Sequence, residues 1–308
     1  MSIEVKNLLK VYGEQKAVNN ISFKVNKGEI VGFLGPNGAG KSTTMKIITG
    51  YLQQDGGDAF VSDINVSEEP LVTKRKIGYL PESNALYYDM YVREYLAFIA
   101  EVHGIADART KIENVIQLTG LTVESKKKIG QLSKGYKQRV GLAAALVHNP
   151  EVLILDEATS GLDPNQIVEI REVIKQQGKD KTVLFSSHIL QEVEAICDRV
   201  IIINKGEIVA DDKLSNLQRG NQDKHVVKVE FKESVNSSLL HKINDASIVE
   251  PQGQFSESTS FKLETLKPEA VRKQILQLSL ENNLNIVSLQ SENQSLEEVF
   301  RSLTQNAD

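Results

Sequence analysis

The sequence predicts an α/β fold with a largely parallel sheet, followed by a small α+β domain. Strand-like apolar runs alternate with helical patterns from residue 30 to residue 204, which is the order of strands joined by crossover helices. The composition then changes at a polar stretch over about 213–224, in which Leu214 and Leu217 are the only large apolar residues. We therefore expect a large domain over 1–215 and a small accessory domain over 225–308.

Composition and charge restrict the class of protein. A chain of 308 residues, 40% hydrophobic and 25% charged, is typical of a globular protein with one large and one small domain. The net charge of −5 gives no basic footprint, so we expect no nucleic-acid partner. Cys197 is the single cysteine, and the N-terminus lacks the layout of a signal peptide. No apolar run is long enough to cross a bilayer, so we expect a cytoplasmic protein that reaches a membrane only by docking.

The first part of the chain reads mainly as strands. Residues 3–12 and 17–25 alternate around a turn, and Glu29–Leu34 is a short buried strand that leads into a glycine-rich loop and a helix ending near Gly50. Residues 55–58 then read as a turn, and 59–62 and 77–80 as further strands.

A helical insertion comes next. Apolar residues recur at three- and four-residue steps over about 91–103, 107–118 and from Ser133 to Pro150, so we expect an inserted helical subdomain over about 88–150. The α/β pattern resumes with the apolar strand 152–155 and a helix that begins near Pro164. Strand 182–185, helix 189–196 and a hairpin of 200–203 with 207–210 complete the domain.

The accessory domain shows a β-α-β-β-α-β order. Alternating residues predict a strand over 227–231, and a short helix follows near 239–243. Strands near 247–249 and 259–264, a helix over about 271–278 and a strand over 286–289 complete the order, which is compatible with a ferredoxin-like fold. A last amphipathic helix carries Leu296, Val299, Phe300 and Leu303.

The loop between strand and helix predicts a phosphate-binding P-loop. Its residues are Gly35, Pro36, Asn37, Gly38, Ala39, Gly40, Lys41, Ser42 and Thr43. Glycines allow backbone N–H groups to turn toward an anion, and the following helix directs the positive end of its dipole to the same point. Lys41 adds a mobile charge for the β- and γ-phosphates of ATP, and the Ser42 hydroxyl is a ligand for Mg²⁺. A glycine-rich turn with a chance Lys-Ser pair is the alternative.

Two acidic residues close the buried strand 152–155. In P-loop enzymes a carboxylate at the place of Asp156 holds Mg²⁺, and Glu157 is then placed to orient or deprotonate the attacking water. The alternative interpretation is an acidic pair that solvates the end of a strand.

The segment Leu132-Ser133-Lys134-Gly135-Tyr136 resembles the signature motif, usually Leu-Ser-Gly-Gly-Gln, of the ATP-binding subunits of ABC transporters. Tyr12 occupies the position of the aromatic residue that stacks on adenine, Ser160–Asp163 resembles the D-loop, and His188 resembles the switch histidine. Six such motifs follow in order over about residues 2–215. The resemblance implies the P-loop NTPase fold of ABC ATPases, with a mixed sheet, a RecA-like core and an inserted helical subdomain.

The resemblance also implies how a complete site is built. Two chains dimerise head to tail around ATP, so that one chain supplies the P-loop with Tyr12, and the partner supplies Ser133, Gly135 and Asp163. The implied catalytic residues are Lys41, Glu157 and His188, and the implied Mg²⁺ ligands are Ser42, Glu82 and Asp156.

The sequence departs from the family pattern at three positions. Lys134 replaces the first glycine of the signature motif, and Tyr136 replaces its glutamine. Glu82 stands where the family usually has glutamine; a carboxylate keeps an oxygen for the metal but adds negative charge beside phosphates.

Within the family, the chain is most similar to exporter-type subunits with a small C-terminal domain, in particular those associated with bacterial gliding motility. The runs 32–35, 77–82 and 88–94 carry this likeness. It implies a separate integral membrane permease as partner and a peripheral location on the inner face of the cell membrane. Two alternatives stay open: an ABC ATPase that remodels a macromolecular assembly, and a regulatory protein that holds ATP without hydrolysis, against which the intact Glu157 argues.

Overall fold

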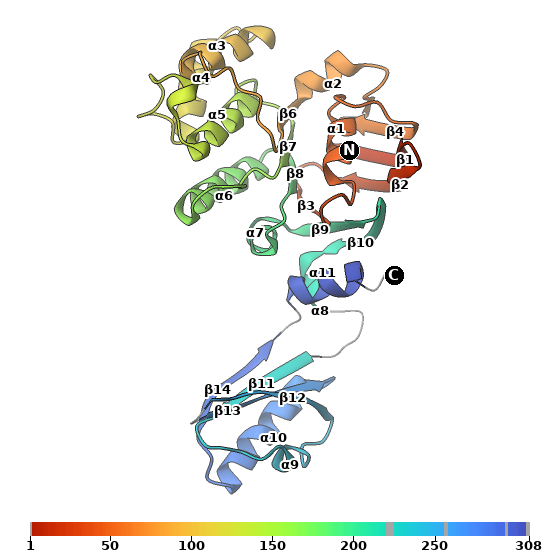
Figure 1. Cartoon of the computed structure of the whole chain (residues 1–308), viewed down its shortest axis with the longest axis vertical. Helices are drawn as coiled ribbons and strands as arrows, with labels where there is room; N and C mark the ends of the chain where they lie inside the picture. Colours follow the sequence, from red (N-terminus) through yellow and green to blue (C-terminus); the bar gives the residue numbers. More distant parts are fainter. Residues whose placement is uncertain (1, 220–224, 256–257, 293–294, 306–308) are drawn as a thin grey trace. The chain divides into compact units, whose positions relative to one another are not determined.

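The computed structural model describes residues 2–219, 225–255, 258–292 and 295–305. The chain divides into two compact units, Met1–Lys213 and Leu214–Asp308, each with its own hydrophobic core (Figure 1).

A six-stranded sheet forms the centre of the first unit. Its strands lie in the order β10-β9-β3-β8-β7-β6, and all neighbours run parallel except β10. Their bounds are β3 Ile30–Leu34, β6 Ile77–Leu80, β7 Val152–Asp156, β8 Thr182–Ser186, β9 Arg199–Asn204 and β10 Glu207–Lys213. Every residue of β3, β7 and β8 is buried. The prediction of an α/β fold with a largely parallel sheet is therefore confirmed.

The parallel strands place three loops at one edge of this sheet. The glycine-rich loop follows β3, Glu157 follows β7, and Ser187 with His188 follows β8. Because β3 pairs with β8 and β8 pairs with β7, these loops are neighbours although more than a hundred residues separate the first from the others. Ligands of open α/β sheets bind at this edge.

A four-stranded antiparallel sheet covers helix α1 (Lys41–Ile48) from the other side. Its order is β2-β1-β4-β5, with β1 Ile3–Tyr12, β2 Gln15–Val25, β4 Gly56–Val61 and β5 Ile64–Asn65. Met45 and Ile48 of α1 share one core with residues of both sheets, and the rings of Phe23 in β2 and Phe33 in β3 are 5.5 Å apart. The two sheets thus hold α1, and with it the end of the glycine-rich loop, from both sides.

Two features of this region differ from the predictions. The predicted turn over 55–58 is largely strand, because β4 begins at Gly56 and pairs with β1. Gly57 has a φ of 73° and lies so close to β1 that a Cβ atom would be 2.2 Å from the Asn7 carbonyl oxygen. Helix α2 (Pro70–Lys76) was not predicted. Thr73 is its only buried residue, and Leu71 is 75% exposed, so the helix lacks an apolar periodicity.

The predicted helical insertion is present. It consists of α3 Val92–Val102, α4 Ala108–Leu118, a short 3₁₀ turn Ile129–Gln131 and α5 Lys134–Leu146, which pack on one another. Arg139 of α5 is buried, and it donates hydrogen bonds to the Thr119 carbonyl oxygen at 3.2 Å and to Glu169 at 2.5 Å. Helices α6 (Pro164–Gly178) and α7 (Leu190–Ile196) follow β7 and β8, as the sequence predicts.

The second unit is a small α+β domain. Its antiparallel sheet has the order β12-β13-β11-β14, with the chain order β-α-β-β-α-β that the sequence predicts. The elements are α8 Leu214–Arg219, β11 His225–Phe231, α9 Ser237–Leu240, β12 Ala246–Phe255, β13 Ser258–Thr265, α10 Pro268–Glu281, β14 Ile286–Glu292 and α11 Leu296–Gln305. Strand β12 is longer than predicted, since it continues past an irregularity at Pro251. Helix α8 lies in the stretch predicted as a polar boundary, and 220–224 fall outside the described residues.

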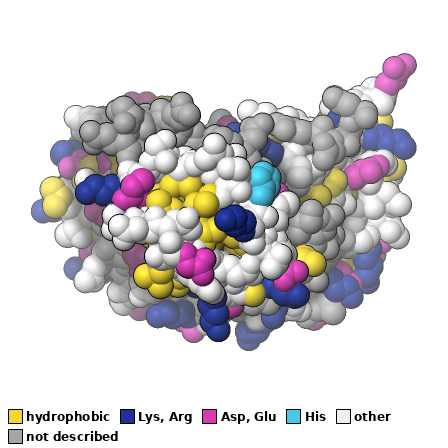
Figure 2. Space-filling model, turned by 90° about the horizontal axis from the view of Figure 1, so that it is seen from below, with side chains coloured by type: hydrophobic (Ala, Val, Ile, Leu, Met, Phe, Trp, Pro, Cys, Tyr) yellow, Lys and Arg dark blue, Asp and Glu magenta, His cyan; other side chains and the backbone are white. Residues whose placement is uncertain are grey.

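Two surface properties bear on partners. Within the part of the chain that the structure describes, no helix is both long enough and apolar enough to span a bilayer. On the face drawn in Figure 2, the described Lys and Arg side chains are interspersed with Asp and Glu rather than gathered into one basic patch.

Candidate active site

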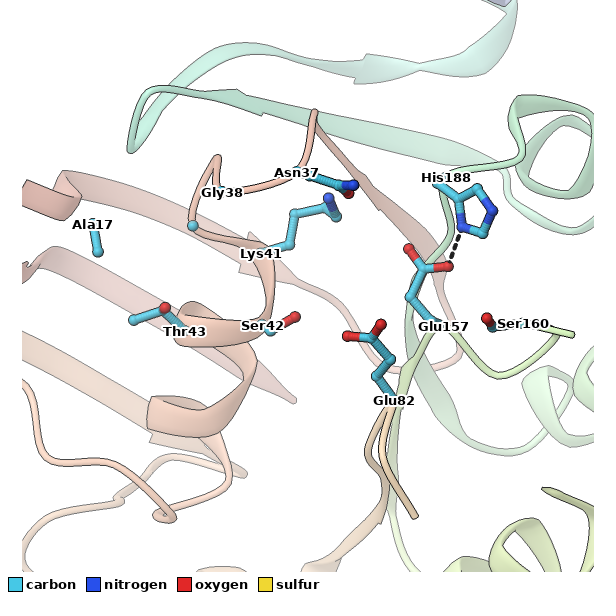
Figure 3. A pocket seen from close by; sticks show the side chains of 11 residues that line it. Ala17, Asn37, Gly38, Lys41, Ser42, Thr43, Glu82, Glu157, Ser160 and His188 are labelled. Atoms are coloured by element: carbon cyan, nitrogen blue, oxygen red, sulfur yellow. Dashed lines mark hydrogen bonds and ion pairs between the residues drawn. The ribbon is translucent and has the colours of Figure 1, made fainter. Parts of the chain in front are cut away.

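A cleft of about 450 Å³ lies at the carboxyl ends of the parallel strands (Figure 3). Its lining comes from the β2 strand, the glycine-rich loop, the loop after β6, and the loops after β7 and β8: Ala17, Asn37, Gly38, Gly40, Lys41, Ser42, Thr43, Glu82, Glu157, Ser160 and His188. Of these, only Ala17 belongs to none of the motifs recognised in the sequence. The cleft therefore joins residues that are widely separated along the chain.

The glycine-rich loop fits tightly against its neighbours. Gly40 adopts a φ of 109°, and a Cβ atom there would lie 2.4 Å from the Ala17 carbonyl oxygen. A Cβ atom on Gly35 would lie 2.3 Å from the Ile203 carbonyl oxygen. Helix α1 begins directly after Gly40, so the free N–H groups of its first turn face the cleft. The loop thus has the backbone geometry of an anion-binding site.

Lys41 is held by the loop to which it belongs. Its ammonium group donates to the carbonyl oxygens of Gly35 at 2.6 Å and Pro36 at 3.1 Å, and only 7% of the residue is exposed. Burial lowers the pKa of Lys41 from the usual lysine value, and the negative charges of Glu157, Asp156 and Glu82 oppose this effect.

One serine hydroxyl contacts both residues of the acidic pair. Asp156 is 1% exposed and accepts a hydrogen bond of 2.7 Å from the Ser186 hydroxyl, which in turn accepts from the Glu157 N–H at 3.1 Å. The backbone of Glu157 has a φ of 55°, an unfavourable conformation that points its side chain into the cleft (Figure 3). There Glu157 Oε2 accepts a hydrogen bond of 2.5 Å from His188 Nδ1.

The three predicted metal ligands share a second cavity. It has a volume of about 350 Å³ and is lined by Ser42, Glu82 and Asp156, of which Ser42 and Glu82 also line the first cleft. Two carboxylates and a hydroxyl are the hard oxygen donors that Mg²⁺ prefers, and they leave positions for phosphate oxygens and water. Among the described residues there is no group of three or more His, Cys, Asp or Glu with metal-binding geometry, and this donor set does not need one.

Besides Asp156 and the P-loop residues Gly35, Pro36 and Ala39, four predicted residues do not line the cleft. Tyr12 lies at the end of β1, half exposed, with the Lys10 ammonium 5.6 Å from its ring centroid. Ser133 caps α5, because its hydroxyl accepts from the Tyr136 N–H at 3.3 Å. Asp163 caps α6 in the same way, and Gly135 lies against the Gln166 side chain of that helix. Ser133, Gly135 and Asp163 thus lie outside the cleft of their own chain, and their predicted contacts are with the nucleotide of a partner.

The departures from the family pattern have local partners. The Tyr136 ring packs on the guanidinium group of Arg139, at 5.6 Å. The Lys134 side chain lies along Gly161, where a Cβ atom would be 2.2 Å from its ammonium nitrogen. Lys134 and Glu82 line one further cavity of about 500 Å³.

Buried polar residues next to the cleft, among them Ser186 and Glu192, were not predicted from the sequence. A signal was present for Glu192: the helical period places it on the apolar face of α7 that also carries Val193 and Ile196.

Comparison with known proteins identifies the family. The model of the family described as ABC transporter matches residues 18–160. The linearmycin resistance ATP-binding protein LnrL of Bacillus subtilis is 34% identical over 305 residues, which cover 98% of this chain and 98% of that protein. The chain belongs to the ATP-binding subunits of ABC transporters. The bacitracin transport ATP-binding protein BcrA of Bacillus licheniformis is 33% identical and covers 97% of this chain and 95% of its own length.

A solved structure adds the chemistry of the family. The dimeric post-hydrolysis state of the ATP-binding cassette MJ0796, with ADP and Pi bound, is 26% identical to this chain with a TM-score of 0.64, and the match covers 69% of this chain and 98% of that one. This ABC subunit is therefore an ATPase. The two relatives named above are named for linearmycin resistance and for bacitracin transport, so they give no support to the predicted association with gliding motility.

Proposed function

We propose that this ABC subunit hydrolyses ATP as a head-to-tail dimer and thereby drives a separate membrane permease in export. The observation that carries the proposal is the similarity to LnrL and BcrA, named for linearmycin resistance and bacitracin transport, over almost the whole chain including the C-terminal unit. The second unit has its own core and contributes nothing to the lining of the cleft, so we assign it an accessory role.

The geometry of the cleft supports a division of roles. The N–H groups at the start of α1 bind the phosphates, and Lys41 exchanges the carbonyl oxygens of Gly35 and Pro36 for phosphate oxygens. Ser42, Asp156 and Glu82 would hold Mg²⁺, which supplies charge neutralisation on the β- and γ-phosphates. Glu157 accepts a proton from the attacking water, and His188 orients the Glu157 carboxylate through their hydrogen bond.

A second copy of the chain would complete the site. In the dimer that we propose, Ser133, Gly135 and Asp163 contact the nucleotide held by the partner, because none of them lines the cleft of their own chain. Ser133 and Gly135 lie at the N-terminus of the 13-residue helix α5, whose dipole favours a phosphate. We place Tyr12 beside the adenine, since its ring is half exposed at the end of β1 in the four-stranded antiparallel sheet.

We propose that the aromatic face at the start of the helical insertion meets the permease. Tyr87, Tyr88, Tyr91 and Phe98 are each at least 40% exposed, and the rings of Tyr87 and Phe98 meet edge to face at 5.9 Å. Exposed aromatic groups of this kind are enriched in protein interfaces. The segment from Glu82 to Tyr88 connects this face directly to the cleft, so a change at the nucleotide can be transmitted to a partner. This docking places the subunit on the inner face of the cell membrane.

Membrane partitioning tests this proposal. The full chain is produced in the cells of its own source organism, and the fraction that sediments with membranes is measured. We expect a Tyr87→Ala, Phe98→Ala double variant to retain basal ATPase activity and to lose most of its membrane-bound fraction. Leu280→Ala is the matched control, because Leu280 is 84% exposed but lies in the second unit. Equal membrane fractions for the wild type and the double variant would contradict the docking surface.

A further inference from the structure

Helix α7 buries a carboxylate on its apolar face. Glu192 is 0% exposed, as buried as its neighbour Val193. Carboxylates are almost never fully buried unless they are hydrogen-bonded or paired with a cation. Glu192 makes no ion pair among the described residues, so hydrogen bonds must stabilise the buried carboxylate.

One oxygen of Glu192 accepts two hydrogen bonds. Its Oε2 atom accepts from the Thr159 hydroxyl at 2.5 Å and from the Ser187 hydroxyl at 2.7 Å. The Ser187 oxygen in turn accepts from the Ile189 N–H at 3.0 Å, so its hydroxyl proton is directed to Glu192. The Oε1 atom of Glu192 is buried without a hydrogen-bond partner. The carboxylate is therefore held by two hydroxyl groups alone.

These two hydroxyl groups belong to the two loops that carry Glu157 and His188. Thr159 follows Glu157 by two residues in the loop after β7, and Ser187 directly precedes His188 in the loop after β8. On the cleft side, Glu157 and His188 are joined by their own hydrogen bond of 2.5 Å. Glu192 does not line the cleft, so it joins the same two loops from behind.

We propose that Glu192 is a positioning residue: by holding Thr159 and Ser187 together, it keeps Glu157 and His188 at hydrogen-bond distance. This inference rests on the proposed roles of Glu157 and His188. Glu157 needs such support because its backbone lies in the left-handed region, where a non-glycine residue is held only by its surroundings. Misplacement of a catalytic group by about 1 Å lowers turnover by about 100-fold.

The experiment compares four variants of the full chain, at Thr159, Ser187 and Glu192, with one control. Thr159→Val and Ser187→Ala each remove one hydroxyl with little change of volume, Glu192→Leu removes the acceptor, and Glu192→Gln retains an oxygen that can accept from both hydroxyls. Val193→Ala is the matched control, because it removes buried packing from the same helix and its apolar side chain makes no hydrogen bond to either loop. The measurements are kcat, KM for ATP, and the melting temperature.

We expect Thr159→Val and Ser187→Ala to lower kcat by roughly tenfold each and Glu192→Leu by about 100-fold, with KM for ATP changed less than about threefold in each. Glu192→Gln should keep kcat within about threefold of the wild type, and Val193→Ala should lower the melting temperature with kcat unchanged. In a His188→Ala background, Thr159→Val should have no further effect, since the pair that it positions is already broken.

Two results would overturn the proposal. One is a wild-type kcat in both Thr159→Val and Ser187→Ala. These two variants test the proposal even if Glu192→Leu does not fold. The other is the same loss of kcat in Val193→Ala as in the hydroxyl variants, since the effect would then be general destabilisation. A failure of the proposed roles is recognised separately, because Glu157→Gln would then hydrolyse ATP at the wild-type rate.

Discussion

The ammonium nitrogen of Lys41 lies 2.6 Å from the backbone carbonyl oxygen of Gly35, at the opposite end of the same loop. The lysine thereby closes the loop on itself, and the Pro36 carbonyl oxygen at 3.1 Å adds a second acceptor. This arrangement keeps the charge close to the cleft before any phosphate is bound. Because a phosphate is a stronger acceptor than a carbonyl group, ATP is expected to displace both contacts.

We expect Lys41→Ala to weaken ATP binding by roughly 10- to 100-fold, the loss of a charge-assisted hydrogen bond. ATP turnover should fall by about three orders of magnitude, since transition-state charge is no longer stabilised. Equilibrium binding and ATPase rates measure the two effects. Lys74→Ala, which removes an exposed lysine of α2, is the control and should behave as the wild type. Wild-type turnover in Lys41→Ala would show that the cleft is not the site of hydrolysis.

Glu82 lines the nucleotide cleft, the predicted metal cavity and the cavity of Lys134. Glu82→Gln keeps a ligand oxygen but removes a negative charge beside the phosphates. We expect basal ATPase activity to stay within about fivefold, since the P-loop contacts and Glu157 are untouched. Stimulation by the permease in proteoliposomes should change more. A collapse of basal turnover in a folded variant would instead make Glu82 a catalytic residue.

The two units have separate cores, and among the residues that the structure describes none after Lys213 lines the cleft. A chain that ends at Lys213 is therefore expected to fold cooperatively and to bind ATP within about threefold of the full-length affinity. Thermal unfolding followed by circular dichroism and equilibrium ATP binding provide the measurements. A truncated chain that is folded yet does not bind ATP would contradict this separation.

The buried side chain of His148 is expected to make the free energy of unfolding sensitive to acid. It stacks on His103 with ring centroids 3.9 Å apart, and its Nε2–H donates to the Ile77 carbonyl oxygen at 3.0 Å. Burial, followed by the charge of His103, lowers the pKa of His148 to about 4. Between about pH 6.5 and pH 4 the unfolded chain binds a proton that the folded chain does not, so this stability is present above pH 6.5 and is lost as the pH falls.

The contribution can be isolated by mutation. Between pH 7.5 and pH 5 the free energy of unfolding should fall by about 2 kcal/mol more in the wild type than in His148→Gln, whose amide does not titrate. Urea unfolding at the two pH values measures the difference. An equal loss in both proteins would show that protonation of His148 is not linked to unfolding.

The parts of the fold that were predictable are those with strong local patterns. The apolar runs of β3, β7 and β8 are buried throughout, and helices α3 and α4 of the insertion each have an apolar face, so their periodicity alone located them. Helix α2 was not predicted because it buries almost no side chain. The glycine-rich start of β4 was not predicted because it forms a strand only through its pairing with β1. Both are decided by tertiary contacts that a single sequence does not display.

The same distinction applies to the site. Lys41, Ser42, Glu82, Glu157 and His188 were located by motif, and the fold brings them to one cleft. Ser186 and Glu192 were not, because their roles arise from the pairing of β7 with β8 and the packing of α7 behind the loops. Ser133, Gly135 and Asp163 do not line the cleft, so their predicted roles depend on a second chain, whereas Tyr12 is predicted to contact the adenine bound to its own chain.

In the proposed mechanism ATP binds between two chains, and Glu157 then accepts a proton from the attacking water. Glu157→Gln preserves the shape of the side chain but removes the base. Size-exclusion chromatography with light scattering, in the presence of ATP and Mg²⁺, tests both parts at once when the eluted nucleotide is analysed. We predict a stable dimer that retains intact ATP, and a monomer for the double variant that also carries Ser133→Ala. A Glu157→Gln protein that stays monomeric with ATP bound, or that releases ADP at the wild-type rate, would contradict the account.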